Sequence, residues 1–122
     1  MRPKSAAFLW DIQRSARLVI ERTAGLSVSE LEGDIILRSA IERHLEIIGE
    51  ASRRLSEHDP ETFDLVPHLL GMIRLRNVIA HQYERIDWSN VRNIIDGPLV
   101  EISEEVTRLL DVHCLPEGRT TQ

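Results

Sequence analysis

The chain has 122 residues, of which 42% are hydrophobic and only 4% are aromatic. This length suits one globular core and is too short for two, so we expect one domain. Charged residues make up 29%, and the net charge of −5 disfavours a nucleic-acid partner unless the arginines gather locally. A single cysteine, Cys114, excludes an intrachain disulfide, and no stretch approaches the ~20 apolar residues that span a bilayer. We therefore expect a cytoplasmic protein.

The N-terminal half of the chain predicts two helices. Apolar residues recur at spacings of three and four over residues 8–20, which is the period of an amphipathic helix, and Gly25 marks its end. Either Ser27 or Ser29 then serves as the N-cap of a longer helix. The apolar period of this second helix continues to about Leu55.

Gly49 lies in the interior of the second predicted helix. A glycine at such a position costs about 1 kcal/mol relative to alanine. Close packing would explain its presence, because the missing side chain lets a second helix approach. We therefore expect a helix–helix contact at Gly49.

The segment of residues 56–67 carries turn residues and predicts a connection that holds at most a short turn of helix. Pro67 suits the first turn of a third helix, because its missing N–H needs no partner there. The apolar positions of this third helix continue to about His81.

A fourth predicted helix completes the fold. Asp87 is its expected N-cap, and the dipeptide Gly97-Pro98 kinks or breaks it. Four amphipathic helices with short connections predict an all-α protein, an antiparallel bundle of four to five helices. We assign residues 1–115 to this single domain and residues 116–122 to a flexible C-terminal tail.

Helical bundles often hold metal ions, but the local ligand motifs are missing from this sequence. Carboxylate-bridged di-metal bundles use Glu-x-x-His pairs, and no Glu in this chain has a His three residues after it. There is also no His-x-x-x-His, no cysteine pair and no glycine-rich phosphate loop. We therefore expect neither a metal ion nor a cofactor.

The octapeptide RNVIAHQY at residues 76–83 contains the strongest candidate site. On a helix, Asn77 and His81 share one face, while Arg76 and Tyr83 share a neighbouring face. We expect Asn77 to hydrogen-bond a ring nitrogen of His81, and Arg76 to fold toward the imidazole. The alternative is an ordinary histidine at the edge of the core.

An arginine and a histidine together suit cleavage of RNA by its own ribose 2′-hydroxyl. Histidine moves protons near neutral pH, and arginine can neutralise the charge that develops on the phosphate in place of a metal ion. One histidine is insufficient for two proton transfers. A two-fold dimer that joins two copies of the third helix would supply a base and an acid, so the chemistry predicts a homodimer.

RNVIAHQY resembles the Arg-x4-His-x-Tyr signature of the HepT-like toxins, which belong to the HEPN superfamily of helical nucleotide-binding and ribonuclease domains. The similarity extends to LEIIGEASRRLS at residues 45–56, GMIRLRNVIAHQY at residues 71–83 and IDWSNVRNII at residues 86–95. It therefore covers most of the chain and implies a HEPN-like fold.

The resemblance implies the toxin of a type II/VII-like toxin–antitoxin pair, acting as a metal-independent endoribonuclease at a homodimer cleft. It implies that Arg76 and His81 are the catalytic pair and that Asn77 supports them. It also implies that a cognate nucleotidyltransferase antitoxin inhibits the enzyme by adding AMP to Tyr83. The alternative is a non-catalytic HEPN module that binds a nucleotide or a protein.

Other charged residues carry weaker expectations. We interpret Glu42, Glu46 and Glu50, which are spaced four apart, as a solvated helix face. Four histidines have no partner motif and are interpreted as surface or boundary residues: His44, His58, His68 and His113. Six arginines are candidates to gather at the cleft and hold RNA phosphates: Arg43, Arg53, Arg54, Arg74, Arg85 and Arg92.

Overall fold

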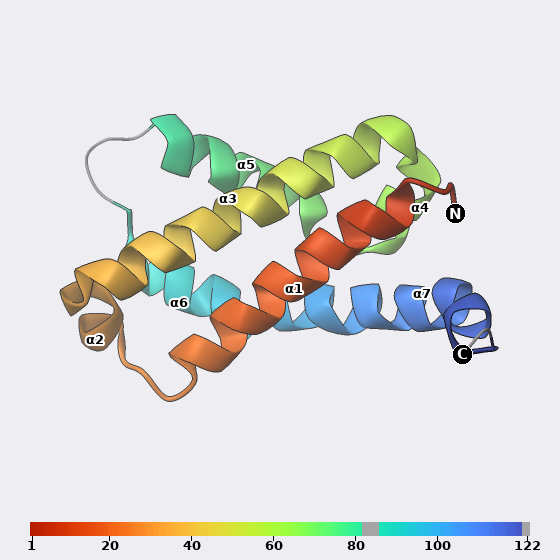
Figure 1. Cartoon of the computed structure of the whole chain (residues 1–122). Helices are drawn as coiled ribbons and strands as arrows, with labels where there is room; N and C mark the ends of the chain where they lie inside the picture. Colours follow the sequence, from red (N-terminus) through yellow and green to blue (C-terminus); the bar gives the residue numbers. More distant parts are fainter. Residues whose placement is uncertain (82–85, 121–122) are drawn as a thin grey trace.

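The structure, a computed structural model, describes the backbone of residues 1–81 and 86–120 and the side chains of residues 1–81 and 86–113. Four long helical segments run alternately in opposite directions (Figure 1). They are α1 (Ser5–Thr23), α3 (Ile35–His58), α5 (Leu69–His81), and α6 (Trp88–Asp96) followed by α7 (Pro98–Thr120). The short helices α2 (Val28–Gly33) and α4 (Pro60–Leu65) lie in the connections. The predicted all-α antiparallel bundle is confirmed.

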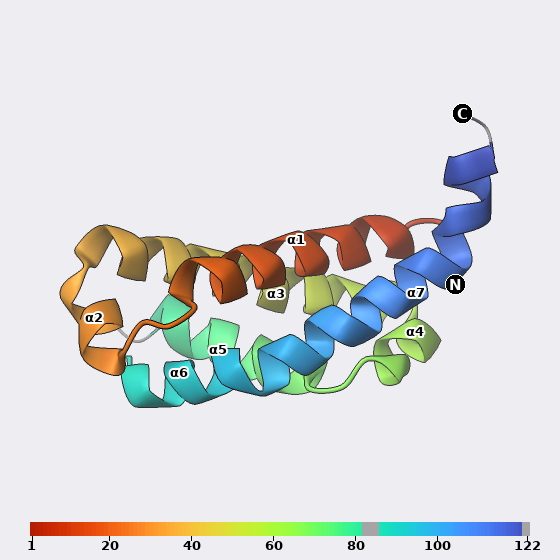
Figure 2. The same cartoon turned by 90° about the horizontal axis from the view of Figure 1, so that it is seen from below.

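The helices form two layers. Figure 2 shows α1 and α3 in one layer and α5, α6 and α7 in the other. α3 contacts both α1 and α5, and α1 also contacts α7. α3 is therefore the element that connects the first layer to α5.

Side-chain caps begin α2 and α6 where the sequence predicts them. The Ser27 hydroxyl accepts a hydrogen bond from the backbone N–H of Glu30, and the Glu30 carboxylate accepts one from the N–H of Ser27. This reciprocal arrangement is a capping box. The Asp87 carboxylate accepts from two backbone N–H groups at the start of α6. α6 ends just before Gly97 and α7 begins at Pro98, so the predicted break is also confirmed.

The prediction of one continuous second helix is wrong, because the structure divides this segment into α2 and α3. α2 ends at Gly33, and the next residue, Asp34, has an extended backbone with φ −106° and ψ 100°. The Asp34 carboxylate accepts from the backbone N–H of Leu37 and caps α3. Leu31 and Ile35 keep the spacing of one helix, but the chain bends between them.

The third predicted helix begins later than expected. α5 starts at Leu69, and His68 has a φ of 68°, in the left-handed region, so Pro67 precedes the helix instead of occupying its first turn. The preceding connection holds α4, which with six residues is longer than the short turn that we expected. At the C-terminus the bounds of α7 include residues 116–120, and the flexibility of the tail stays a prediction.

The core lies between the two layers and consists mostly of leucine, isoleucine and valine. α5 contributes little to it, since only Leu69 and Met72 of this helix are buried. Leu70 and Val78 are instead 51% and 43% exposed. α5 therefore carries apolar side chains that the described part of the chain leaves uncovered. None of the described helices combines the length and apolar character needed to cross a bilayer.

Candidate functional site

A close contact between α3 and α5 positions the candidate site. A Cβ atom on Gly49 would lie 2.3 Å from the Cβ atom of Arg76 and 2.8 Å from the carbonyl oxygen of Met72. Only a glycine lets the α5 backbone lie this near to α3. The predicted role of Gly49 is confirmed, and its consequence is that Arg76 lies against α3 beside Glu50.

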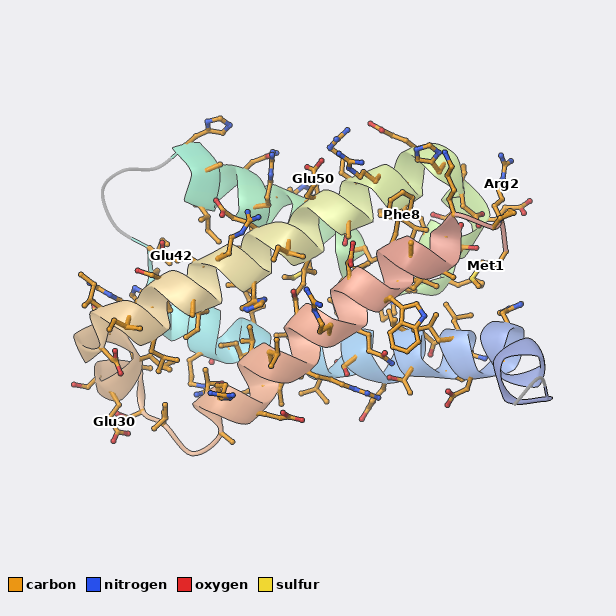
Figure 3. All side chains as sticks on the ribbon, in the orientation of Figure 1. Met1, Arg2, Phe8, Glu30, Glu42 and Glu50 are labelled. Carbon is orange, nitrogen blue, oxygen red and sulfur yellow. The ribbon has the colours of Figure 1, made fainter. Side chains whose placement is uncertain are left out.

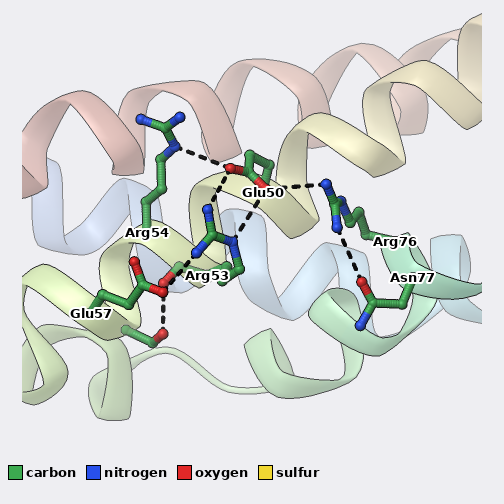
Figure 4. Close-up of polar contacts among 7 residues, drawn as sticks. Glu50, Arg53, Arg54, Glu57, Arg76 and Asn77 are labelled. Carbon is green, nitrogen blue, oxygen red and sulfur yellow. Dashed lines mark hydrogen bonds and ion pairs between the residues drawn. The ribbon is translucent and has the colours of Figure 1, made fainter. Parts of the chain in front are cut away.

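The Arg76 guanidinium contacts both helices (Figure 4). Its Nη2 atom lies 3.5 Å from Glu50 Oε1, and its Nη1 atom donates a hydrogen bond of 3.1 Å to the amide oxygen of Asn77. The expected hydrogen bond between Asn77 and His81 is not found among the described residues, and the Asn77 amide oxygen accepts from Arg76 instead. The expectation that Arg76 folds toward the imidazole is wrong as well, since the Glu50 carboxylate attracts the guanidinium toward α3.

Glu50 is a site residue that the sequence analysis missed. Its Oε2 atom accepts hydrogen bonds from Arg53 at 2.8 Å and from Arg54 at 3.1 Å. The hydrogen bond from Arg53, then that from Arg54 and the charge of Arg76, outweigh burial and lower the pKa of Glu50 to about 2. Glu50 is 32% exposed, so it is partly solvated as interpreted, but its role is to bind three arginines. Arginines three and four residues after this glutamate were the signal that could have identified it.

A groove of about 380 Å³ opens beside this cluster. Figure 3 shows Phe8 at the seam between α1 and α3, and Glu50 on the side of α3 that faces α5. The groove is lined by residues of these three helices: Phe8, Asp11, Arg43, Glu46, Ile47, Glu50, Ala51, Arg54, Arg76 and Ala80. Three guanidinium groups and three carboxylates therefore line a hollow that solvent reaches. Each guanidinium has five N–H donors, so it can bind a phosphate oxygen while it pairs with a carboxylate.

His81 lies away from this groove. It is exposed and is the last residue of α5, five positions after Arg76. Five residues correspond to about 140° around a helix, so the two side chains leave α5 on different sides. The His81 side chain makes no hydrogen bond with any residue that the structure describes. A single chain thus does not bring the predicted catalytic pair together, and Tyr83 lies outside the described residues.

The arginines expected at the cleft are only partly gathered there. Arg43 and Arg54 line the groove, and Arg74 is exposed on α5. Arg92 is not at the groove, because its Nη1 atom donates to the carbonyl oxygen of Thr23, the last residue of α1, at 2.9 Å and to that of Leu26, in the connection to α2, at 3.0 Å. These hydrogen bonds join α6 to the end of α1 and the loop that follows it, so Arg92 has a structural role. Arg85 lies outside the described residues.

The remaining four histidines are confirmed as surface or boundary residues: His44, His58, His68 and His113. The Nδ1 atom of His44 lies 3.0 Å from the Ser15 hydroxyl, between α3 and α1. Burial, followed by the charges of Arg14 and Arg43, lowers the pKa of His44. Among the described side chains, no group of three or more His, Cys, Asp or Glu residues could hold a metal ion.

Known proteins resemble most of this chain. The family model described as ribonuclease HepT-like matches residues 12–109. A protein of Methanocaldococcus jannaschii named as a candidate RNase is 40% identical over 100 residues, which cover 82% of this chain and 91% of that protein. Another M. jannaschii protein with such a name is 34% identical over 102 residues, covering 80% and 84%. One from Caldanaerobacter subterraneus subsp. tengcongensis is 30% identical over 105 residues, covering 84% and 91%. No solved structure gives a significant match.

Proposed function

Because the chain belongs to the HepT-like ribonuclease family, we propose that it is a metal-independent endoribonuclease whose catalytic groups are Arg76 and His81. The observation that carries this proposal is the placement of Arg76. Its guanidinium lies in the wall of an open groove, between the Glu50 carboxylate and the Asn77 amide. A cation held in an accessible groove can bind a phosphodiester without a metal ion.

In this proposal the ribose 2′-oxygen attacks the adjacent phosphorus. One His81 imidazole takes the proton of the 2′-hydroxyl, and a second imidazole gives a proton to the departing 5′-oxygen. The Arg76 guanidinium neutralises the negative charge that accumulates on the nonbridging oxygens. The products are a 2′,3′-cyclic phosphate and a 5′-hydroxyl.

Two copies of the chain supply the two imidazoles. Leu70 and Val78 leave α5 within about 60° of His81, on the side away from the core. Because both are substantially exposed, packing of α5 against the α5 of a second copy would bury apolar surface and bring two His81 side chains into one cleft. This uncovered apolar surface supports a homodimer.

We also propose that the chain is the toxin of a toxin–antitoxin pair and that a cognate nucleotidyltransferase adds AMP to Tyr83. Tyr83 follows the end of α5 by two positions, close in sequence to the catalytic groups. The phosphate of an added AMP would occupy Arg76 and so exclude the RNA phosphate. Peptide mass spectra of the co-expressed proteins should show additions of about 330 Da at Tyr83. An unmodified Tyr83 in an inhibited complex would mean that the partner blocks the groove itself.

The test of the proposed activity uses purified, unmodified protein and total RNA in EDTA, with analysis of the fragment ends. We expect cleavage that leaves cyclic or 3′-phosphate ends. An RNA whose cleaved nucleotide lacks the 2′-hydroxyl should resist. Loss of cleavage in EDTA would contradict metal independence. Binding of RNA without cleavage, with or without metal ions, would favour the non-catalytic HEPN module.

A further inference from the structure

The outer face of α1 and the groove beside Arg76 together suit a strand of unpaired RNA. We propose that Trp10 stacks on a base, that Arg14 and Arg17 bind the neighbouring phosphates, and that the strand continues across Asp11 toward Arg76. This inference rests on the proposed ribonuclease function and identifies the surface that holds its substrate.

Trp10 is the aromatic group of this surface. It is 56% exposed, whereas the other tryptophan, Trp88, is 5% exposed and packs in the core. The one ring pair among the described aromatic side chains joins Phe8 to His58, so the Trp10 indole has no ring partner there. An exposed indole can stack on any unpaired base, because every base has a π-face.

The arginines of α1 are available to phosphate groups: Arg14, Arg17 and Arg22. None of them forms an ion pair with a carboxylate of any described residue, although Asp11 and Glu21 lie on the same helix. Arg17 donates a hydrogen bond of 3.1 Å to the Thr107 hydroxyl on α7, which orients its guanidinium. By contrast, six other arginines are each paired with a carboxylate: Arg43, Arg53, Arg54, Arg76, Arg92 and Arg108.

The charge distribution favours an anionic ligand on this part of the molecule. Residues 1–23 hold five of the 15 basic residues but only two of the 20 acidic ones, so this segment has a net charge of +3 and the rest has −8. At the contact of α1 with α3, the charges of Arg14 and Arg43 add to the effect of burial in lowering the pKa of His44. The net negative charge of the whole chain is therefore not shared by the segment that contains α1.

Two hollows connect this face to the candidate site. One has a volume of about 370 Å³ and includes Trp10 and Arg14 in its lining. The other, of about 380 Å³, includes Arg43 and Arg76. Asp11 lines both, so the two hollows lie next to each other on either side of this residue. Because Asp11 carries a carboxylate, we place a 2′-hydroxyl, which can donate a hydrogen bond, at the junction and the phosphates on either side.

Binding of a short fluorescein-labelled single-stranded oligoribonucleotide to the full-length His81→Ala variant tests this inference, because that variant should keep the RNA uncut. Adding Trp10→Ala should weaken binding about tenfold, and Trp10→Phe should restore most of the affinity. Arg14→Gln and Arg17→Gln should each reduce the slope of log affinity against log salt by about 0.7. Arg108→Gln is the matched control, since this exposed arginine on α7 already pairs with Glu105, and it should bind like the parent.

Tryptophan emission gives a second readout, because RNA should quench exposed Trp10 and leave buried Trp88 unaffected. Quenching should disappear in the Trp10→Phe variant. Unchanged affinity in the Trp10→Ala and arginine variants would overturn the inference even if the wild-type protein cuts RNA. If binding is lost as expected but the wild-type protein cuts no RNA, the results would support RNA binding by Trp10, Arg14 and Arg17 and would contradict the proposed catalysis. Variants that change the oligomeric state but not RNA affinity would identify a protein interface and overturn the inference.

Discussion

Glu50 contacts three arginines from two helices. Its carboxylate lies 3.5 Å from Arg76 and accepts hydrogen bonds from Arg53 and Arg54. Because the pKa of Glu50 is lowered to about 2, the carboxylate stays ionised throughout the neutral range in which histidine exchanges protons. Glu50 can therefore hold Arg76 in place at every pH at which the proposed reaction proceeds, and we assign it the role of a positioning residue.

Substitution Glu50→Gln should lower kcat for RNA cleavage about ten- to a hundredfold without raising KM, because a poorly held Arg76 stabilises the transition state less well. Glu50→Asp should recover part of the rate. The matched control is Glu57→Gln, since Glu57 pairs with Arg53 and makes no contact with Arg76. Equal kcat values for Glu50→Gln and Glu57→Gln would contradict a positioning role.

Asp59 is a second charged residue with an unusual environment. It is 3% exposed and accepts hydrogen bonds from the Arg2 backbone N–H, the Ser5 hydroxyl, and both the N–H and the hydroxyl of Thr62. Burial alone would raise the pKa of Asp59, but these donors hold it well below its usual range. The ionised carboxylate therefore connects the N-terminal segment to α4.

The stability of the protein should consequently fall in acid. A folded-state pKa below the unfolded value of about 3.9 means that Asp59 stabilises the fold above that pH, and that this contribution is lost as the pH falls. Thermal unfolding of Asp59→Asn should depend less on pH than that of the wild type between about pH 5 and pH 2. At neutral pH the variant should be less stable by about 1–3 kcal/mol, because the amide lacks the charge and one of the two acceptor oxygens that the four donors use. Asp64→Asn, on the exposed side of α4, is the control. Identical pH profiles for Asp59→Asn and the wild type would refute this role.

At the scale of helices, the approach of α5 to α3 depends on Gly49. Gly49→Ala should destabilise the fold by about 1–3 kcal/mol, because the new methyl group would overlap Arg76 and the Met72 carbonyl. It should also slow cleavage by moving Arg76 away from Glu50. Gly33→Ala has open space around the added methyl group and serves as the control. A Gly49→Ala variant with wild-type thermal midpoint and rate would contradict the close contact.

Residues that interact only with their neighbours in sequence, such as N-caps, predicted where helices begin. Ser27 and Asp87 cap helices as expected, because a cap requires only neighbouring backbone groups. The break at Gly33 and Asp34 escaped prediction because the apolar spacing continues across it, although Gly-Asp is also a combination of helix end and N-cap.

The candidate site was harder to predict because it depends on contacts between helices. The sequence places Arg76 and Asn77 on α5 but does not say which helix lies opposite. Once Gly49 brings α3 and α5 together, Glu50 is the carboxylate nearest Arg76. The expected contacts to His81 are not formed, because the Arg76 guanidinium pairs with the Glu50 carboxylate on α3 and donates to the amide oxygen of its own neighbour Asn77.

For the whole molecule, the exposed apolar side chains of α5 predict self-association. The protein should elute as at least a dimer, and Val78→Glu should yield a folded monomer without cleavage activity, because it places two carboxylates at the two-fold axis. Val112→Glu is the matched control, since Val112 is 58% exposed on α7, and this variant should keep both mass and activity. A wild-type monomer that cuts RNA at low concentration would refute a shared cleft.

The rate of RNA cleavage in EDTA under single-turnover conditions tests the central claim most directly, measured for the wild type and for Arg76→Ala, His81→Ala and His113→Ala. His113 is exposed on α7 and controls for the loss of a histidine elsewhere. Arg76→Ala and His81→Ala should each lower the rate by at least about a hundredfold while circular dichroism and thermal midpoint stay near those of the wild type. His113→Ala should match the wild type. A rate within about twofold of the wild type for either Arg76→Ala or His81→Ala would contradict the assignment of the catalytic pair.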